Sequence, residues 1–121
     1  MSLEDDAELY RRVRPDQIVD DQNLGRRRPS SAVFKDPNLS VDAEPVLRAN
    51  GLDWHFSLSR YPGFSLASFT AGLARTLNLT VDLRPEADNP AHTEVTGKKT
   101  QGIANAMRDA SKWVHLEPKA K

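Results

Sequence analysis

At 121 residues the chain has the length of one ordinary domain, and its 17 basic side chains balance its 17 acidic ones. The zero net charge excludes a long-range attraction to nucleic acids or anionic membranes, and the absence of cysteine excludes disulfides, thiolate catalysis and cysteine-based zinc sites. A hydrophobic content of 38% predicts a modest core. The chain contains neither a membrane-spanning apolar run nor an apolar signal segment, so we expect a cytoplasmic protein.

The first third of the sequence predicts short, irregular elements. Acidic residues dominate its start, and Asp, Asn, Gly and Pro recur between brief apolar runs. In chain order we expect a disordered tail (1–7), a strand (9–13), a brief pairing (18–19), a loop (20–31) and a contact with the core (32–34).

The middle of the chain predicts a short helix and then a strand. Asp42 is expected to cap the helix and Gly51 to end it, since Asp favours helix starts and Gly favours helix exits. Trp54, Phe56 and Leu58 alternate with polar residues, which predicts a strand over residues 53–58.

The last half carries the strongest patterns. Apolar residues at helical spacing, beginning with Leu66 and Phe69, predict a helix over residues 65–77. A second amphipathic pattern after the good cap Thr100 predicts another helix over residues 101–113. The other expected elements are a strand (79–83), a loop (85–90), a strand (92–96) and a frayed end (117–121).

These elements predict a small single α+β domain over residues 8–116. We expect a short mixed or antiparallel sheet packed by two main helices, at about 65–77 and 101–113, with a loop-rich N-terminal half. The core is expected to come from the apolar side chains between Phe64 and Val114.

The turn from Gly97 to Thr100 is the first candidate site. Lys98, Lys99 and the Thr100 hydroxyl stand at an expected strand-to-helix junction, where free backbone N–H groups favour a phosphate or carboxylate. Position 92 is not glycine, so the turn is not a Walker A loop. The alternative interpretation is an ordinary lysine-bearing turn followed by a helix cap.

His92 and Glu94 form the second candidate site, because alternate residues of a strand share one face. An imidazole beside a carboxylate suits acid–base catalysis or two ligands of a metal. A metal would need a third ligand such as His55 or Asp82, and we predict no metal site. The alternative interpretation is a solvent-facing polar pair.

Arg26, Arg27 and Arg28 form the third candidate, since clustered guanidinium groups bind phosphate or RNA. Asp20 and Asp21 lie close enough in sequence to neutralise them, and no aromatic residue interleaves for base stacking. A solvated loop with local ion pairs is the alternative.

Several segments taken together resemble an uncharacterised group of small bacterial proteins, and the resemblance covers most of the chain. It implies no known activity and therefore carries over no functional residue. The segments are Leu9-Tyr10-Arg11-Arg12 with Asp16-Gln17, residues 28–34 leading to Leu39-Ser40-Val41-Asp42, residues 61–67, Asn89-Pro90-Ala91-His92 and residues 97–100.

The order of a few residues is also similar to ADP-ribosyltransferase-like folds. Those folds use an Arg or His on an early strand, a Ser-centred segment in mid-chain and a Glu on a late strand. Arg11 or Arg12, Ser65 or Ser68, and Glu94 occur in that order. The resemblance implies an enzyme in which Glu94 is the catalytic carboxylate and Arg11 or Arg12 holds an anionic substrate.

The leading hypothesis is a cofactor-free binding module whose partner is another protein or a second copy of this chain. Its anion-binding surface would gather Lys98, Lys99, Thr100, Arg27 and Arg28. The alternatives are the enzyme just described, with His92, Glu94 and Arg12 as catalytic candidates, and a weak nucleic-acid binder. The zero net charge makes nucleic acid the least favoured partner.

Overall fold

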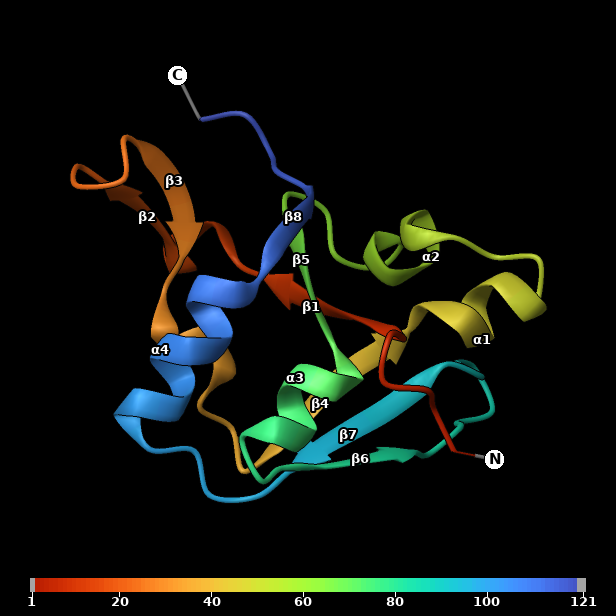
Figure 1. Cartoon of the computed structure of the whole chain (residues 1–121). Coiled ribbons are helices and arrows are strands. Elements are labelled where there is room, and N and C mark those ends of the chain that lie inside the picture. Colours follow the sequence, from red (N-terminus) through yellow and green to blue (C-terminus); the bar gives the residue numbers. More distant parts are fainter. Residues whose placement is uncertain (1, 120–121) are drawn as a thin grey trace.

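The computed structural model describes residues 2–119, where short strands alternate with short helices (Figure 1). The strands in this range are β1 (Glu8–Val13), β2 (Ile18–Asp21), β3 (Arg26–Pro29), β4 (Asn38–Ala43), β5 (Ser65–Thr70), β6 (Thr80–Leu83), β7 (His92–Thr96) and β8 (Lys112–His115). The α-helices are α1 (Glu44–Ala49), α2 (Trp54–Leu58), α3 (Ala71–Thr76) and α4 (Gln101–Ala110), and two 3-10 turns are η1 (Pro15–Gln17) and η2 (Ser31–Phe34), again within residues 2–119.

Within these described residues, six strands form one sheet in the order β6-β7-β4-β1-β5-β8, with antiparallel neighbours throughout. β2 and β3 form a separate hairpin. The predicted α+β class, the single small domain and the antiparallel option are confirmed. The N-terminal half is richer in strands than expected, since it supplies β1 to β4.

The two faces of the sheet differ because side chains alternate along each strand. On β4, Leu39 and Val41 are buried, whereas Ser40 between them is half-buried on the opposite face. In Figure 1, α3 lies in front of the sheet and α4 lies beside it, against η2, and both helices contribute buried side chains to the core. On the opposite face, α2 contacts β1 and β5, and polar side chains remain there.

Both halves of the chain build the core. Phe34 from η2 meets Phe69 from β5 edge to face, with ring centres 6.0 Å apart. Leu9 and Val41 are also fully buried. The expectation of a core confined to residues 64–114 is therefore wrong, because the central strands β1 and β4 come from the N-terminal half. Within the described residues, no helix is both long enough and apolar enough to cross a bilayer.

The segment before β1 is more ordered than the predicted tail. Leu3 and Ala7 are buried in the core, and Arg75 of α3 donates to the Leu3 carbonyl at 2.7 Å. The Gly72 N–H donates to the Asp5 carbonyl at 2.8 Å, and a Cβ at Gly72 would lie 2.9 Å from that oxygen. Close backbone contact therefore fixes residues 3–7; Met1 lies outside the described residues.

The predicted helix over residues 65–77 is wrong in its first half, which forms β5. This strand lies between β1 and β8, and it is buried on both faces. Two-sided burial removes the apolar–polar alternation, so the spacing of Leu66 and Phe69 imitates a helix. Thr70 then caps the short α3, since its hydroxyl accepts a hydrogen bond from the Leu73 N–H at 3.1 Å.

Two other elements differ from expectation at their ends. The Asp53 carboxylate accepts a hydrogen bond from the His55 N–H at 2.9 Å, so the helix α2 begins where a strand was predicted. The last helix, predicted over residues 101–113, ends at Ala110. Trp113 instead belongs to β8 at the edge of the sheet.

The loop predicted over residues 20–31 is largely the β2–β3 hairpin. Arg28 donates to Asp21 at 2.6 Å across it, and the Trp113 ring N–H donates to the Arg27 carbonyl at 3.1 Å. Arg27 in turn donates to the Glu117 carbonyl at 2.8 Å. Residues 117–119 of the predicted frayed end therefore lie beside the hairpin. Residues 120–121 lie outside the described range.

Candidate functional site

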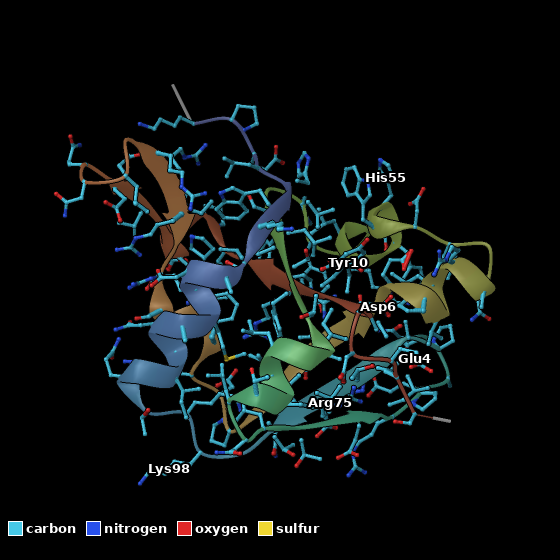
Figure 2. All side chains as sticks on the ribbon, viewed as in Figure 1. Glu4, Asp6, Tyr10, His55, Arg75 and Lys98 are labelled. Atoms are coloured by element: carbon cyan, nitrogen blue, oxygen red, sulfur yellow. The ribbon has the colours of Figure 1, made fainter. Side chains whose placement is uncertain are left out.

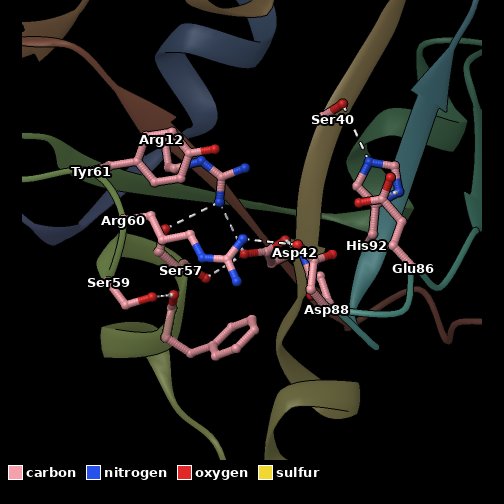
Figure 3. Close-up of a pocket in the computed structure, with 12 residues that line it drawn as sticks. Arg12, Ser40, Asp42, Ser57, Ser59, Arg60, Tyr61, Glu86, Asp88 and His92 are labelled. Atoms are coloured by element: carbon pink, nitrogen blue, oxygen red, sulfur yellow. Dashed lines mark hydrogen bonds and ion pairs between the residues drawn. The ribbon is translucent and has the colours of Figure 1, made fainter.

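A polar cleft of about 350 Å³ opens where β1 and β4 separate (Figure 3). Their pairing runs only from Leu9 to Tyr10 on β1, and beyond it the Arg11 side chain donates to the Ser40 carbonyl at 3.1 Å. Arg12 follows on the other face and lines the cleft. We call this site the Arg12 cleft; it is lined by Arg12, Ser40, Asp42, Phe56, Ser57, Ser59, Arg60, Tyr61, Glu86, Asp88, Asn89 and His92.

A buried carboxylate organises the floor of the Arg12 cleft. Asp42 of β4 is only 1% exposed. Its Oδ2 accepts hydrogen bonds from the Ser57 hydroxyl at 2.6 Å and from Arg12 at 3.3 Å. Its Oδ1 accepts one from the Asn89 amide at 2.8 Å. A buried charge with a cation and further donors is stable, so this network fixes three elements around one carboxylate.

The Arg12 guanidinium is held along one side only. Its Nη1 donates both to Asp42 and to the Ser57 carbonyl, the latter at 3.1 Å. The Tyr61 ring covers it, with the guanidinium carbon 4.3 Å from the ring centre. Within residues 2–119, the Nε–H and Nη2–H of Arg12 have no hydrogen-bond acceptor, although its side chain is only 20% exposed.

His92 and Ser40 stand together in the same cleft, as Figure 3 shows. The His92 Nδ1 lies 3.0 Å from the Arg84 carbonyl oxygen, and its Nε2 lies 3.4 Å from the Ser40 Oγ. A carbonyl only accepts hydrogen bonds, so Nδ1 carries a proton. In the neutral ring, Nε2 then presents a lone pair to the Ser40 hydroxyl. The Glu86 carboxylate lies 4.0 Å from Nδ1.

The rim carries an exposed ion pair. Arg60 donates to Asp88 at 2.8 Å, and the two side chains are 72% and 58% exposed. This hydrogen bond lowers the pKa of Asp88. The pair neutralises itself at the entrance, so the unpaired donors of the cleft lie deeper, at Arg12.

At the turn predicted to bind an anion, residues 97–100, the donors of Lys99 are engaged by the protein's own backbone. The Lys99 ammonium donates to three backbone carbonyls, of Pro37, Val95 and Gly97, at 3.1, 3.0 and 3.2 Å. Burial lowers the pKa of Lys99. Thr100 is the predicted helix cap, with its hydroxyl accepting from Ile103 N–H at 3.2 Å. Lys98 is exposed at the lower edge of the molecule (Figure 2). None of these residues lines the Arg12 cleft.

The arginine run is likewise apart from the cleft. Arg28 is paired with Asp21, as the alternative interpretation expected, and its hydrogen bond lowers the pKa of that carboxyl. Arg27 is bound to the carbonyl of Glu117. The proposed joint surface with Lys98 and Lys99 is not gathered into the cleft that holds His92.

Of the catalytic candidates, His92 and Arg12 line the cleft, whereas Glu94 does not. Glu94 shares the polar face of β7 with His92, as predicted, and pairs in register with Ser40 and Asp82. Arg11 points to the other face, where it donates to the Val33 carbonyl at 3.1 Å. Within residues 2–119, no cluster of three His, Asp or Glu side chains has the geometry of a metal site.

Comparison of the chain with models of known families, with curated proteins and with solved structures gives no match. Both resemblances drawn from the sequence therefore stay predictions, and the site is interpreted from its own geometry.

Sequence reasoning missed the residue at the centre of the cleft. Asp42 was expected to cap α1, but Ala43 occupies the cap position and Asp42 belongs to β4. The alternation of Leu39, Val41 and Ala43 with Ser40 and Asp42 was the available signal, since it places both polar side chains on one face.

Proposed function

We propose that this protein is a binding module for a small ligand that carries a phosphate or carboxylate group, held by Arg12 in the Arg12 cleft. The observation that carries the proposal is the one-sided fixation of Arg12. Asp42 and the Ser57 carbonyl hold Nη1, while Nε–H and Nη2–H have no acceptor among residues 2–119.

An arginine in this state suits an oxyanion. The Nε–H and Nη2–H groups form a planar fork that matches two oxygens of a phosphate or carboxylate. The side chain is already fixed by Asp42 and Tyr61, so little rotamer entropy remains to be lost on binding. Binding would also satisfy two donors that now depend on solvent.

The size and charge of the cleft restrict the ligand. A volume of about 350 Å³ lies at the lower end of small-molecule sites. Asp42 neutralises Arg12, and Glu86 adds a carboxylate near His92. These charges disfavour a polyanion such as nucleic acid and favour a small group with one or two negative charges. The proposed anion site is therefore the Arg12 cleft and not the turn at Gly97 that the sequence predicted.

Calorimetric titration with inorganic phosphate and, separately, with acetate tests the proposal. We expect Arg12→Lys to weaken the binding of the preferred anion by about tenfold or more, because Lys keeps the charge but lacks the fork. Arg14→Gln is the matched control, since Arg14 is 57% exposed and pairs with Asp16 outside the cleft. Equal binding by the wild type and Arg12→Lys, or no binding of either anion, would contradict the proposal.

A further inference from the structure

We propose that the Arg12 cleft also hydrolyses phosphomonoesters, with Ser40 as the nucleophile and His92 as the general base. This inference rests on the proposed function, since Arg12 must first hold the phosphoryl group. It goes further by naming a substrate class and a reaction.

The geometry of His92 carries the first step. Its Nδ1–H is fixed on the Arg84 carbonyl at 3.0 Å, which leaves Nε2 as the basic nitrogen. The Ser40 Oγ is 3.4 Å from that nitrogen. A nucleophile, a base and a third group that orients the base form the arrangement by which a serine hydroxyl is activated. Such contacts are often long without substrate and shorten when it binds.

Ser40 is set on a rigid part of the fold. It lies on β4, in the interior of the sheet between β7 and β1, and its neighbours Leu39 and Val41 are buried. Its side chain is on the cleft face together with Asp42 and Arg12. A phosphoryl group bound to the Arg12 fork would therefore enter a cleft whose wall carries the Ser40 hydroxyl. Figure 3 shows Ser40 beside His92 in the cleft that Arg12 also lines.

The other serine hydroxyls of the cleft are already engaged in hydrogen bonds. The Ser57 hydroxyl donates to Asp42 at 2.6 Å, and the Ser59 hydroxyl donates to the Phe56 carbonyl at 2.8 Å. Among the serines described in residues 2–119, Ser40 is the one with its Oγ in contact with an imidazole nitrogen. The nucleophile is therefore assigned to Ser40.

The reaction has two balanced steps. In the first, the Ser40 Oγ forms a bond to phosphorus, its proton passes to His92 Nε2, and the bond to the departing oxygen breaks. His92 then delivers this proton to the leaving alcohol. In the second, His92 takes a proton from water, the water oxygen bonds to phosphorus, and the Ser40–phosphorus bond breaks as Ser40 recovers a proton. Arg12 stabilises the charge on the phosphoryl oxygens throughout.

The test uses 4-nitrophenyl phosphate, with release of 4-nitrophenolate and the intact mass of the protein as separate readouts. We expect turnover by the wild type and a loss of at least about a hundredfold in Ser40→Ala and in His92→Gln. Both variants should still bind inorganic phosphate in the calorimeter. A brief exposure to substrate should add one phosphoryl group to the wild type and none to Ser40→Ala.

Two matched variants complete the design. Ser31→Ala and His55→Gln change the same residue types outside the cleft, and each should keep the wild-type rate. Wild-type turnover in Ser40→Ala overturns the inference. If the wild type binds phosphate but shows neither turnover nor a phosphorylated protein, the hydrolysis inference is overturned and the binding function stands. If the wild type shows neither phosphate binding nor turnover, both the binding function and the hydrolysis inference are contradicted.

Discussion

Two cations of this protein, Arg12 in the cleft and Lys99 at the Gly97 turn, differ in how many of their donor groups have a protein acceptor. Lys99 directs its donors to three backbone carbonyls and so closes the turn against the end of β7. Arg12 uses one nitrogen for Asp42 and the Ser57 carbonyl, and keeps two donor groups without a protein acceptor among residues 2–119. The difference supports the proposal that Arg12, rather than Lys99, binds an anion, because Arg12 keeps donors available.

Removal of the Asp42 carboxylate is expected to have the largest effect on this comparison. Asp42→Ala leaves Arg12, Ser57 and Asn89 without their common acceptor, and loss of one partner of a buried pair costs about 3 kcal/mol. Urea denaturation measures this loss. Wild-type stability in the variant would show that the network is not structural.

Lys99→Met should separate stability from binding. The substitution leaves three carbonyls without their ammonium donor, and we expect a loss of about 1–2 kcal/mol in the free energy of unfolding. Phosphate affinity at the Arg12 cleft should stay at the wild-type value in calorimetry. A marked drop in affinity, with the fold intact, would return the anion site to the turn.

Tyr61→Leu sharpens the description of the cleft at a smaller scale. The substitution keeps an apolar cover but removes the aromatic face over Arg12, which is worth about 0.5–1 kcal/mol. We therefore expect phosphate to bind about two- to fivefold more weakly. An unchanged Kd would mean that the ring does not hold the guanidinium in place.

The smallest effect is expected in acid, at a cation that is already paired. The Arg28 hydrogen bond lowers the pKa of Asp21 below its ordinary value of 3.8. The folded state thus binds fewer protons there than the unfolded state, so the stabilisation is present above pH 3.8 and is lost as the pH falls through the lower folded-state pKa. Asp21→Asn should flatten this part of the stability-against-pH curve, as thermal unfolding between pH 2 and 5 would show, and leave phosphate binding unchanged.

Alternation between buried and more exposed side chains located some strands, although the similar pattern of β4 was missed. Residues 92–96 alternate between buried Thr93 and Val95 and the half-buried His92 and Glu94, and the strand forms as expected. The prediction for the residues of β5 was wrong because burial on both faces of the strand removes the alternation of apolar and polar side chains. The position of a strand in the sheet did not decide the outcome, since the internal strand β1 was predicted and the edge strand β8 was assigned to the end of a helix.

The site was predicted only in part for a related reason. Imidazole and guanidinium groups drew attention to His92 and Arg12, and both line the cleft. Their meeting with Ser40 and Asp42 depends on the strand order β7-β4-β1, which joins segments about 30 to 80 residues apart. Lys99 was assigned to a ligand because its charge is visible in sequence, whereas the carbonyls that engage it are not.

The most direct test of the central claim is the NMR signal of the Arg12 Nε–H during titration with inorganic phosphate. Arg12→Lys identifies this signal by its absence. The structure predicts a shift that grows with phosphate and saturates, accompanied by shifts of the Ser40 and Ser57 amides and not of Lys99. A stationary Arg12 signal, with phosphate shifts at residues 97–100 instead, would contradict the assignment of the anion site to the Arg12 cleft.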